Sequence, residues 1–179
     1  MLKVNDLKAF LELIDKELNK KIRLVAVGGT AMTLLDLKPS TIDVDFTIPR
    51  EDKKEFERAL QTVPHGFKVD AWPDGMVFSQ QLPADYLKDS IPIKTALRNI
   101  ALSALHPVDI IVTKIGRLDK RDEQDIKACI ERFGIKRQEV EKRARQVAYA
   151  GREENYKINL RHALENFWSS KKARKSWRG

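Results

Sequence analysis

Two aspartates that stand two positions apart, Asp43 and Asp45, are the residues of this sequence best suited to chemistry. They lie in a strand-like run over 41–48, and residues i and i+2 of a strand point to the same face. We therefore expect the two carboxyl groups to project together, roughly 6–7 Å apart. Because like charges on one face repel each other, the pair indicates a bound cation. The opposite, buried face should consist of Ile42, Val44, Phe46 and Ile48.

Magnesium binding is the chemistry that fits this pair. Mg²⁺ takes oxygen ligands and shares its shell with substrate phosphates, and paired ions hold both oxygens of an in-line displacement. A third carboxylate is commonly needed, and Asp70 lies on the next predicted strand, over 67–72. Asp70 could be a third ligand or the base that deprotonates an attacking hydroxyl. The alternatives are a solvated strand face for the pair and an ordinary strand-end acid for Asp70.

A glycine pair, Gly28-Gly29, lies between a predicted strand over 22–28 and a predicted short helix over 30–37. Glycine permits positive φ and lets a ligand approach the backbone closely. The free N–H groups at the start of a helix suit a phosphate, and Thr30 could add a hydroxyl. The spacing matches neither a Walker loop nor a dinucleotide fingerprint, so an ordinary strand–helix turn is the alternative for the pair alone.

A third cluster of charged residues contains Lys114, Asp122 and Asp125. The two acids are separated by three positions and therefore share a helix face. Asp122 also aligns with a buried stripe, where a carboxylate needs a partner that Lys114 or Arg121 could supply. Lys114 could instead reach a triphosphate. The alternative is a helix–helix corner tied by ion pairs, and the two roles are compatible if this corner borders a cleft.

The order of elements predicts an α+β chain that ends in helices. Helices are expected over 6–20, 30–37, 50–63, from 107 onward, from 121 to 133, over 137–150 and over 153–168. Strands are expected over 22–28, 41–48 and 67–72, with one or two more between 75 and 105. The resulting organisation is an α/β core over 1–105, a C-terminal helical part over 106–170, and a basic tail over 171–179 that is a candidate for disorder.

Composition narrows the class of protein. The chain has 179 residues, a net charge of +8 and one cysteine, Cys129, which excludes an intrachain disulfide framework and is expected to be a core residue. No apolar run is long enough to cross a membrane, and the sequence starts without the apolar block of a secretory signal, so we expect a cytoplasmic protein. The basic excess of residues 136–178 favours contact with nucleic acid or nucleotide. A solvated basic face of a heat-adapted protein is the alternative.

In these motifs the chain resembles the DNA polymerase beta-type nucleotidyltransferases. Gly28-Gly29-Thr30-Ala31 followed by Thr41-Ile42-Asp43-Val44-Asp45-Phe46 is similar to their first motif, a glycine pair followed by an acid-x-acid strand. The closer resemblance is to AbiEii-type abortive-infection nucleotidyltransferases and related small prokaryotic proteins. That family also has a lysine-bearing helix and an Arg-Asp-x-x-Asp helix, which correspond here to Lys114 and to Arg121-Asp122-Glu123-Gln124-Asp125.

The resemblance implies a small mixed sheet flanked by helices, with a C-terminal helical part that closes a cleft. It implies transfer of a nucleoside monophosphate from an NTP to a hydroxyl of RNA, such as tRNA, or of protein, with Mg²⁺ or Mn²⁺. Gly28 and Gly29 would hold the triphosphate, Asp43 and Asp45 the metal ions, and Lys114 the phosphates. Asp122 or Asp125 would help to shape the site. AbiEii-like members include toxins of toxin–antitoxin pairs, so an antitoxin protein is a candidate partner.

Two other readings compete with this one. A chain with the same fold but no catalysis could use its basic helices to bind RNA or a partner protein. A phosphohydrolase or nuclease could use the same paired acids, and it would release free phosphate or nucleotide in place of pyrophosphate.

Overall fold

Strand β1 (Ile22–Ala26) lies at the centre of a five-stranded mixed sheet with the order β3-β2-β1-β7-β6. The computed structural model describes residues 1–151 and 153–168. On one side of β1 runs β2 (Val44–Ile48), antiparallel to it, and β3 (Val69–Pro73) runs parallel to β2. On the other side β7 (Ile100–Ala104) is parallel to β1, and β6 (Ile91–Pro92) closes that edge.

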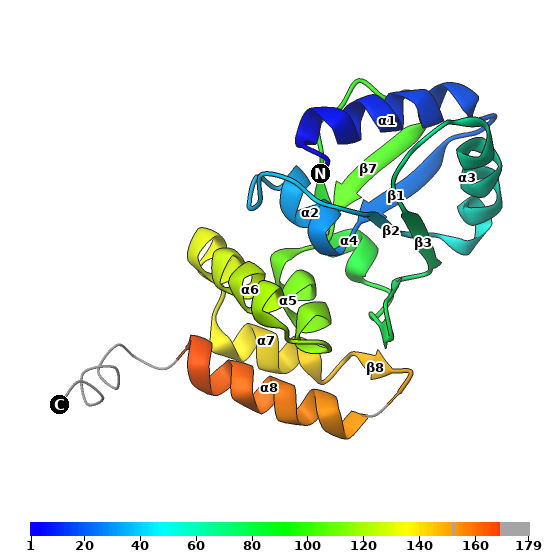
Figure 1. Cartoon of the computed structure of the whole chain (residues 1–179). Coiled ribbons are helices and arrows are strands. Elements are labelled where there is room, and N and C mark those ends of the chain that lie inside the picture. The colour runs from blue at the N-terminus through cyan, green and yellow to red at the C-terminus, as the bar shows by residue number, and fades with distance from the viewer. Residues whose placement is uncertain (152, 169–179) are drawn as a thin grey trace.

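Helices α1 (Val4–Glu17) and α3 (Arg50–Thr62) pack against each other and over the sheet (Figure 1). Their apolar faces form the core with the sheet; Phe56 of α3, for example, contacts Phe46 of β2 edge to face with ring centroids 5.9 Å apart. Helix α2 (Gly28–Leu34) leaves the end of β1 and packs against β2 and α5 (Pro107–Ile115). The start of α2 is therefore held beside the strand that carries Asp45.

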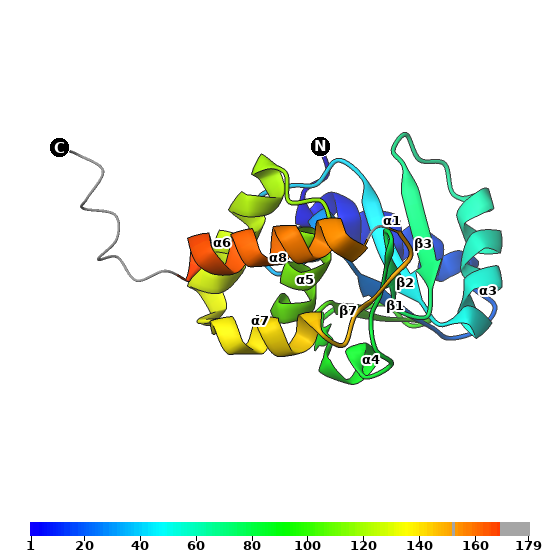
Figure 2. The ribbon, with the colours of Figure 1, turned by 90° about the horizontal axis from the view of Figure 1, so that it is seen from below.

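The C-terminal helices gather around α5, all nine residues of which are buried. Helices α6 (Lys120–Phe133), α7 (Arg137–Ala144) and α8 (Glu153–Phe167) pack against it (Figure 2). Helix α6 ends at Gly134, which has φ +66°, as predicted for a glycine stop. Cys129 of α6 is fully buried beside Met32 of α2, which confirms the prediction that it is a core residue.

A second, small sheet joins the two parts of the chain. Its strands are β4 (Met76–Val77), β5 (Gln80–Gln81) and β8 (Ala148–Tyr149), and the short helix α4 (Tyr86–Asp89) follows β5. Strand β8 lies within the predicted helical part, 106–170, but pairs with β5 of the predicted core, 1–105.

The α+β architecture with a mixed sheet and C-terminal helices is confirmed, and four local predictions are wrong. Four strands, β4 to β7, lie between 75 and 105, where one or two were predicted. The helix predicted over 137–150 ends at Ala144, because the following residues pair with β5 and form β8. Strand β2 begins only at Val44, because Thr41 pairs with Leu2 and draws the chain aside. Ile42 is consequently 58% exposed and is not part of the core.

Two further predictions concern the C-terminal tail and membrane-spanning helices. The basic tail over 171–179 lies outside the described residues. Within the described part of the chain, none of the helices combines the length and the hydropathy that a membrane span requires.

Candidate active site

The three predicted acids lie at one edge of the sheet. Asp45 of β2 is in register with Asp70 of the parallel strand β3, so their side chains share a face at the spacing of neighbouring strands, about 4.8 Å. Asp43 directly precedes β2 and is exposed. Burial raises the pKa of Asp45 to about 6, and the charges of Asp70 and Asp43 add to the effect. The arrangement thus concentrates negative charge that a cation would neutralise.

Two threonines fix the backbone that carries these acids. The hydroxyl of Thr30, which is fully buried in α2, donates to the carbonyl oxygen of Asp43 at 3.2 Å and accepts the N–H of Asp45 at 2.9 Å. The hydroxyl of Thr41 also donates to the Asp43 carbonyl oxygen, at 2.9 Å. The hydroxyl of Thr30 therefore positions the acids in this structure, and its contact with a phosphate stays a prediction.

The glycine pair brings backbone close to the acids. Gly28 has φ +52°, a conformation that costs a residue with a side chain about 1–2 kcal/mol, and a Cβ there would lie 3.6 Å from Oδ2 of Asp45. A Cβ on Gly29 would lie 2.6 Å from Oγ1 of Thr41 and would displace the threonine that holds Asp43. Both glycines are therefore required by the fold of the acidic edge, and both line the same cleft.

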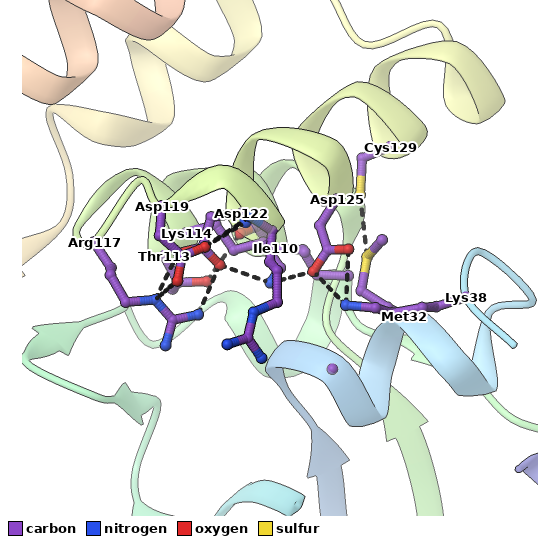
Figure 3. A network of polar contacts seen from close by, with 12 residues as sticks. Met32, Lys38, Ile110, Thr113, Lys114, Arg117, Asp119, Asp122, Asp125 and Cys129 are labelled. Atoms are coloured by element: carbon purple, nitrogen blue, oxygen red, sulfur yellow. Dashed lines mark hydrogen bonds and ion pairs between the residues drawn. The ribbon is translucent and has the colours of Figure 1, made fainter. Parts of the chain in front are cut away.

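An ion network centred on the C-terminal helices borders the same cleft as the acids (Figure 3). Nζ of Lys114 lies 3.1 Å from Oδ1 of Asp122 and 2.6 Å from Oδ2 of Asp125. Arg117 contacts Asp122 at 2.7 Å, and Lys38 contacts Asp125 at 3.0 Å. Burial raises the pKa of Asp122, but the hydrogen bond from Arg117 and the charge of Lys114 outweigh it and hold that pKa below its usual value.

Lys114 is thus the partner that was predicted for Asp122, whereas Arg121 is not. An ammonium group has three N–H donors, and the two carboxylates use two of them. Lys114 is only 6% exposed yet lines the cleft, so its third donor is available to a ligand there. Asp122 and Asp125 act on this site by holding Lys114, and a direct contact of either with nucleotide stays a prediction.

The acids, glycines and cations enclose one cleft of about 410 Å³. Its lining combines residues from both parts of the chain: Met1, Gly28, Gly29, Lys38, Ser40, Thr41, Ile42, Asp43, Asp45, Lys68, Asp70, Phe78, Lys114, Arg117, Arg121 and Asp125. Lys68 is paired with Asp70 at 2.6 Å. Among the residues that the structure describes, Arg121 is the cleft cation without an ion pair.

Sequence reasoning did not assign a role to several of these residues. Lys38 follows the short helix α2, Arg117 lies in the turn after α5, and Phe78 lies between two very short strands. Lys38 reaches Asp125 across 87 positions of sequence, a contact that no local pattern indicates. Only Arg121 carried a signal, because it begins the Arg-Asp-x-x-Asp pattern.

The donor set fits Mg²⁺. Asp43, Asp45 and Asp70 offer only carboxylate oxygens, the ligands that a hard cation prefers. Across residues 1–151 and 153–168, no group of three or more His, Cys, Asp or Glu side chains is placed to hold a metal ion by itself, and this includes Asp43, Asp45 and Asp70. A metal bound here would complete its shell with water and phosphate oxygens, which is the usual coordination of Mg²⁺ at phosphate sites.

Comparison with known proteins agrees with this geometry. Residues 3–175 match the family described as "Nucleotidyltransferase of unknown function (DUF6036)". The chain belongs to this family. No curated protein and no solved structure matches the chain. For a nucleotidyltransferase, a cleft that combines paired acids, a glycine turn and several cations is the expected place for a nucleoside triphosphate.

Without bound metal, ionisation of Asp45 should lower the stability of this nucleotidyltransferase, so its stability should depend on pH. The pKa of Asp45 is about 6 in the folded chain, above the ordinary value of 3.8. Protonation of Asp45 therefore favours folding. This stabilisation is complete below about pH 4 and is lost as pH rises through 6. Allowing for partial solvent screening, Asp45→Asn should raise the free energy of unfolding by about 1–2 kcal/mol at pH 8.

Chemical denaturation of the wild type and of Asp45→Asn in EDTA, at pH 4 and at pH 8, measures this difference. The two proteins should be closer in stability at pH 4, where the carboxyl is neutral in the folded chain and only about half ionised in the unfolded chain. A variant that is less stable than the wild type at pH 8 would contradict the assignment.

Proposed function

We propose that the chain is a Mg²⁺-dependent nucleotidyltransferase that moves a nucleoside monophosphate from an NTP to a hydroxyl of RNA, such as tRNA, or of a protein. The observation that carries the proposal is the position of Asp43, Asp45 and Asp70 beside the Gly28-Gly29 turn in a single cleft. Membership of a nucleotidyltransferase family supports the reaction class.

In the proposed reaction, the acceptor oxygen forms a bond with the α-phosphorus of the NTP. The bond from that phosphorus to the oxygen bridging to the β-phosphate breaks, and pyrophosphate leaves. Asp70 takes the proton of the attacking hydroxyl, since it lies beside Asp45 and its side chain is partly exposed. Asp43 and Asp45 hold Mg²⁺, which when bound neutralises charge on the phosphates.

The cations of the cleft would bind the triphosphate. Gly28 and Gly29 line the cleft with backbone alone, which a phosphate would approach more closely than a side chain allows. Lys114 offers its remaining N–H donor, and its two carboxylate partners keep it in place. Arg121, without an ion pair among the described residues, supplies a full positive charge to phosphates of the nucleotide or of the acceptor.

A role as a toxin of a toxin–antitoxin pair belongs to this proposal through the resemblance to AbiEii-type proteins. We also propose the cytoplasmic location that the composition led us to expect. The net charge of +8 supports an RNA acceptor, because a polyanion is attracted to a basic protein. A tRNA acceptor would present a terminal hydroxyl, and a protein acceptor would present a serine, threonine or tyrosine hydroxyl.

Label transfer tests the proposal. The protein is incubated with each NTP labelled at the α-phosphate, Mg²⁺ and either total RNA or total protein. We expect label on an acceptor, release of pyrophosphate from γ-labelled NTP, and loss of both signals in EDTA. Release of labelled inorganic phosphate without transfer would favour a phosphohydrolase. Transfer that persists unchanged in the double variant Asp43→Ala, Asp45→Ala would refute the assignment.

A further inference from the structure

Phe78 is an exposed aromatic residue in an unfavourable backbone conformation. It begins the two-residue turn between β4 and β5, has φ +54° and is 45% exposed. Such hairpin turns favour glycine, asparagine or aspartate at positions with positive φ. A phenylalanine there is strained and does not recover the cost by full burial, which points to a use for its ring outside the fold.

Phe78 is one of the residues that line the cleft. Its Cζ is 3.6 Å from the position of a Cβ on Gly28, and its centroid is 5.2 Å from that of Trp72, which supports it from β3. Phe78 lines the main cleft together with Asp45 and also lines an adjoining cavity of about 200 Å³. The ring therefore stands between the acidic edge and a second space, which Lys114 and Arg117 border as well.

A buried amide forms part of the wall of this adjoining cavity. Gln80 is only 5% exposed, and its Oε1 accepts no hydrogen bond within the described residues. The amide packs directly against Gly116, since a Cβ on that glycine would lie 1.8 Å from Nε2 of Gln80. A buried acceptor without a donor is costly and uncommon in folded proteins, and a ligand that brings an N–H group would satisfy it.

We propose that Phe78 and Gln80 form the base-binding subsite of the cleft: the nucleobase stacks on Phe78, and its exocyclic amino group donates to Oε1 of Gln80. This inference rests on the proposed function, and it names the residues that recognise the substrate. The cavity is large enough for a ring, with about seven times the roughly 30 Å³ that a water occupies in the liquid. Among the four bases of RNA, only uracil has no exocyclic amino group, so UTP should bind most weakly.

Calorimetry with two kinds of probe tests whether the nucleobase stacks on Phe78. The probes are each of the four NTPs and inorganic tripolyphosphate, which has no base, all with Mg²⁺ and without acceptor. Phe78→Ala should weaken the binding of ATP by about 5-fold to 100-fold and change that of tripolyphosphate by less than about 2-fold. Phe78→Tyr should retain ATP affinity. Leu13→Ala, which removes an exposed apolar side chain of α1 outside the cleft, is the matched control and should change neither.

Gln80→Leu tests whether Gln80 recognises the exocyclic amino group of the base. We expect the spread of affinities among the four NTPs to shrink in this variant, mainly through weaker binding of ATP, CTP and GTP. Equal affinity of all four NTPs for the wild type would overturn the role of Gln80. Unchanged ATP binding by Phe78→Ala, or an equal loss for ATP and tripolyphosphate, would overturn only the stacking role of Phe78. Failure of the wild type to bind either probe would instead overturn the proposed function.

Discussion

Replacement of Asp45 by asparagine should reduce nucleotide transfer by about 10³-fold or more while leaving the protein folded. Asparagine keeps the size of the side chain and one oxygen, but it removes the charge that holds a divalent cation. Because Asp45 is crowded by Asp70 and Asp43, the fold without metal should gain stability from the same change. Loss of activity together with a gain in stability is the signature expected of a residue that serves catalysis at the expense of the fold.

Steady-state transfer of the α-phosphate label, measured at saturating Mg²⁺, gives the size of the effect. Asp36→Asn is the matched control, since Asp36 is exposed and outside the cleft, and asparagine tolerates its positive φ of 57°. The control should keep full activity. An Asp45→Asn variant with activity within a few-fold of the wild type would contradict the role of this carboxylate.

Replacement of Lys114 by methionine should lower the free energy of unfolding by about 3 kcal/mol. Methionine fills much of the same space, but Asp122 and Asp125 lose the shared ammonium group between them. Both carboxylates are nearly buried, so their charges are poorly solvated once one partner is gone. Phosphate binding should weaken as well, since Lys114 borders the cleft.

Urea denaturation of three variants separates the causes. Lys38→Met, which removes the more exposed partner of Asp125, should cost less than about 1 kcal/mol. Combining Lys114→Met with Asp125→Asn should recover part of the lost stability, because one unpaired buried charge is then removed. A Lys114→Met variant as stable as the wild type would show that the network contributes nothing to the fold.

The part of the site that could be predicted from the sequence is the part set by strand geometry. Alternation along the predicted strand led us to expect Asp43 and Asp45 together, and both line the cleft, although Asp43 lies in the bend before β2. The register of β2 with β3 brings Asp70 beside Asp45. The start of β2 was harder to predict, because the pairing of Thr41 with Leu2 depends on the distant N-terminus. The prediction for Ile42 was wrong for this reason.

The basic side of the cleft could not be predicted in the same way. Helix periodicity predicted that Asp122 is buried and needs a partner, with Lys114 and Arg121 as the candidates. Lys38 and Arg117 enter through contacts and turns without a repeating pattern. Strand β8 formed where helical periodicity predicted a helix, because pairing with β5 outweighed local preference. The position of Phe78 in the cleft could not be predicted for a related reason, since two-residue strands leave almost no periodic signal in the sequence.

The most direct test of the account is anomalous X-ray diffraction from crystals that contain Mn²⁺ and an NTP whose α,β-bridging oxygen is replaced by methylene. We predict a manganese signal at the carboxylates of Asp43 and Asp45, with the triphosphate against Gly28 and Gly29. Manganese and nucleotide bound elsewhere, with these two aspartates bearing no ligand, would contradict it.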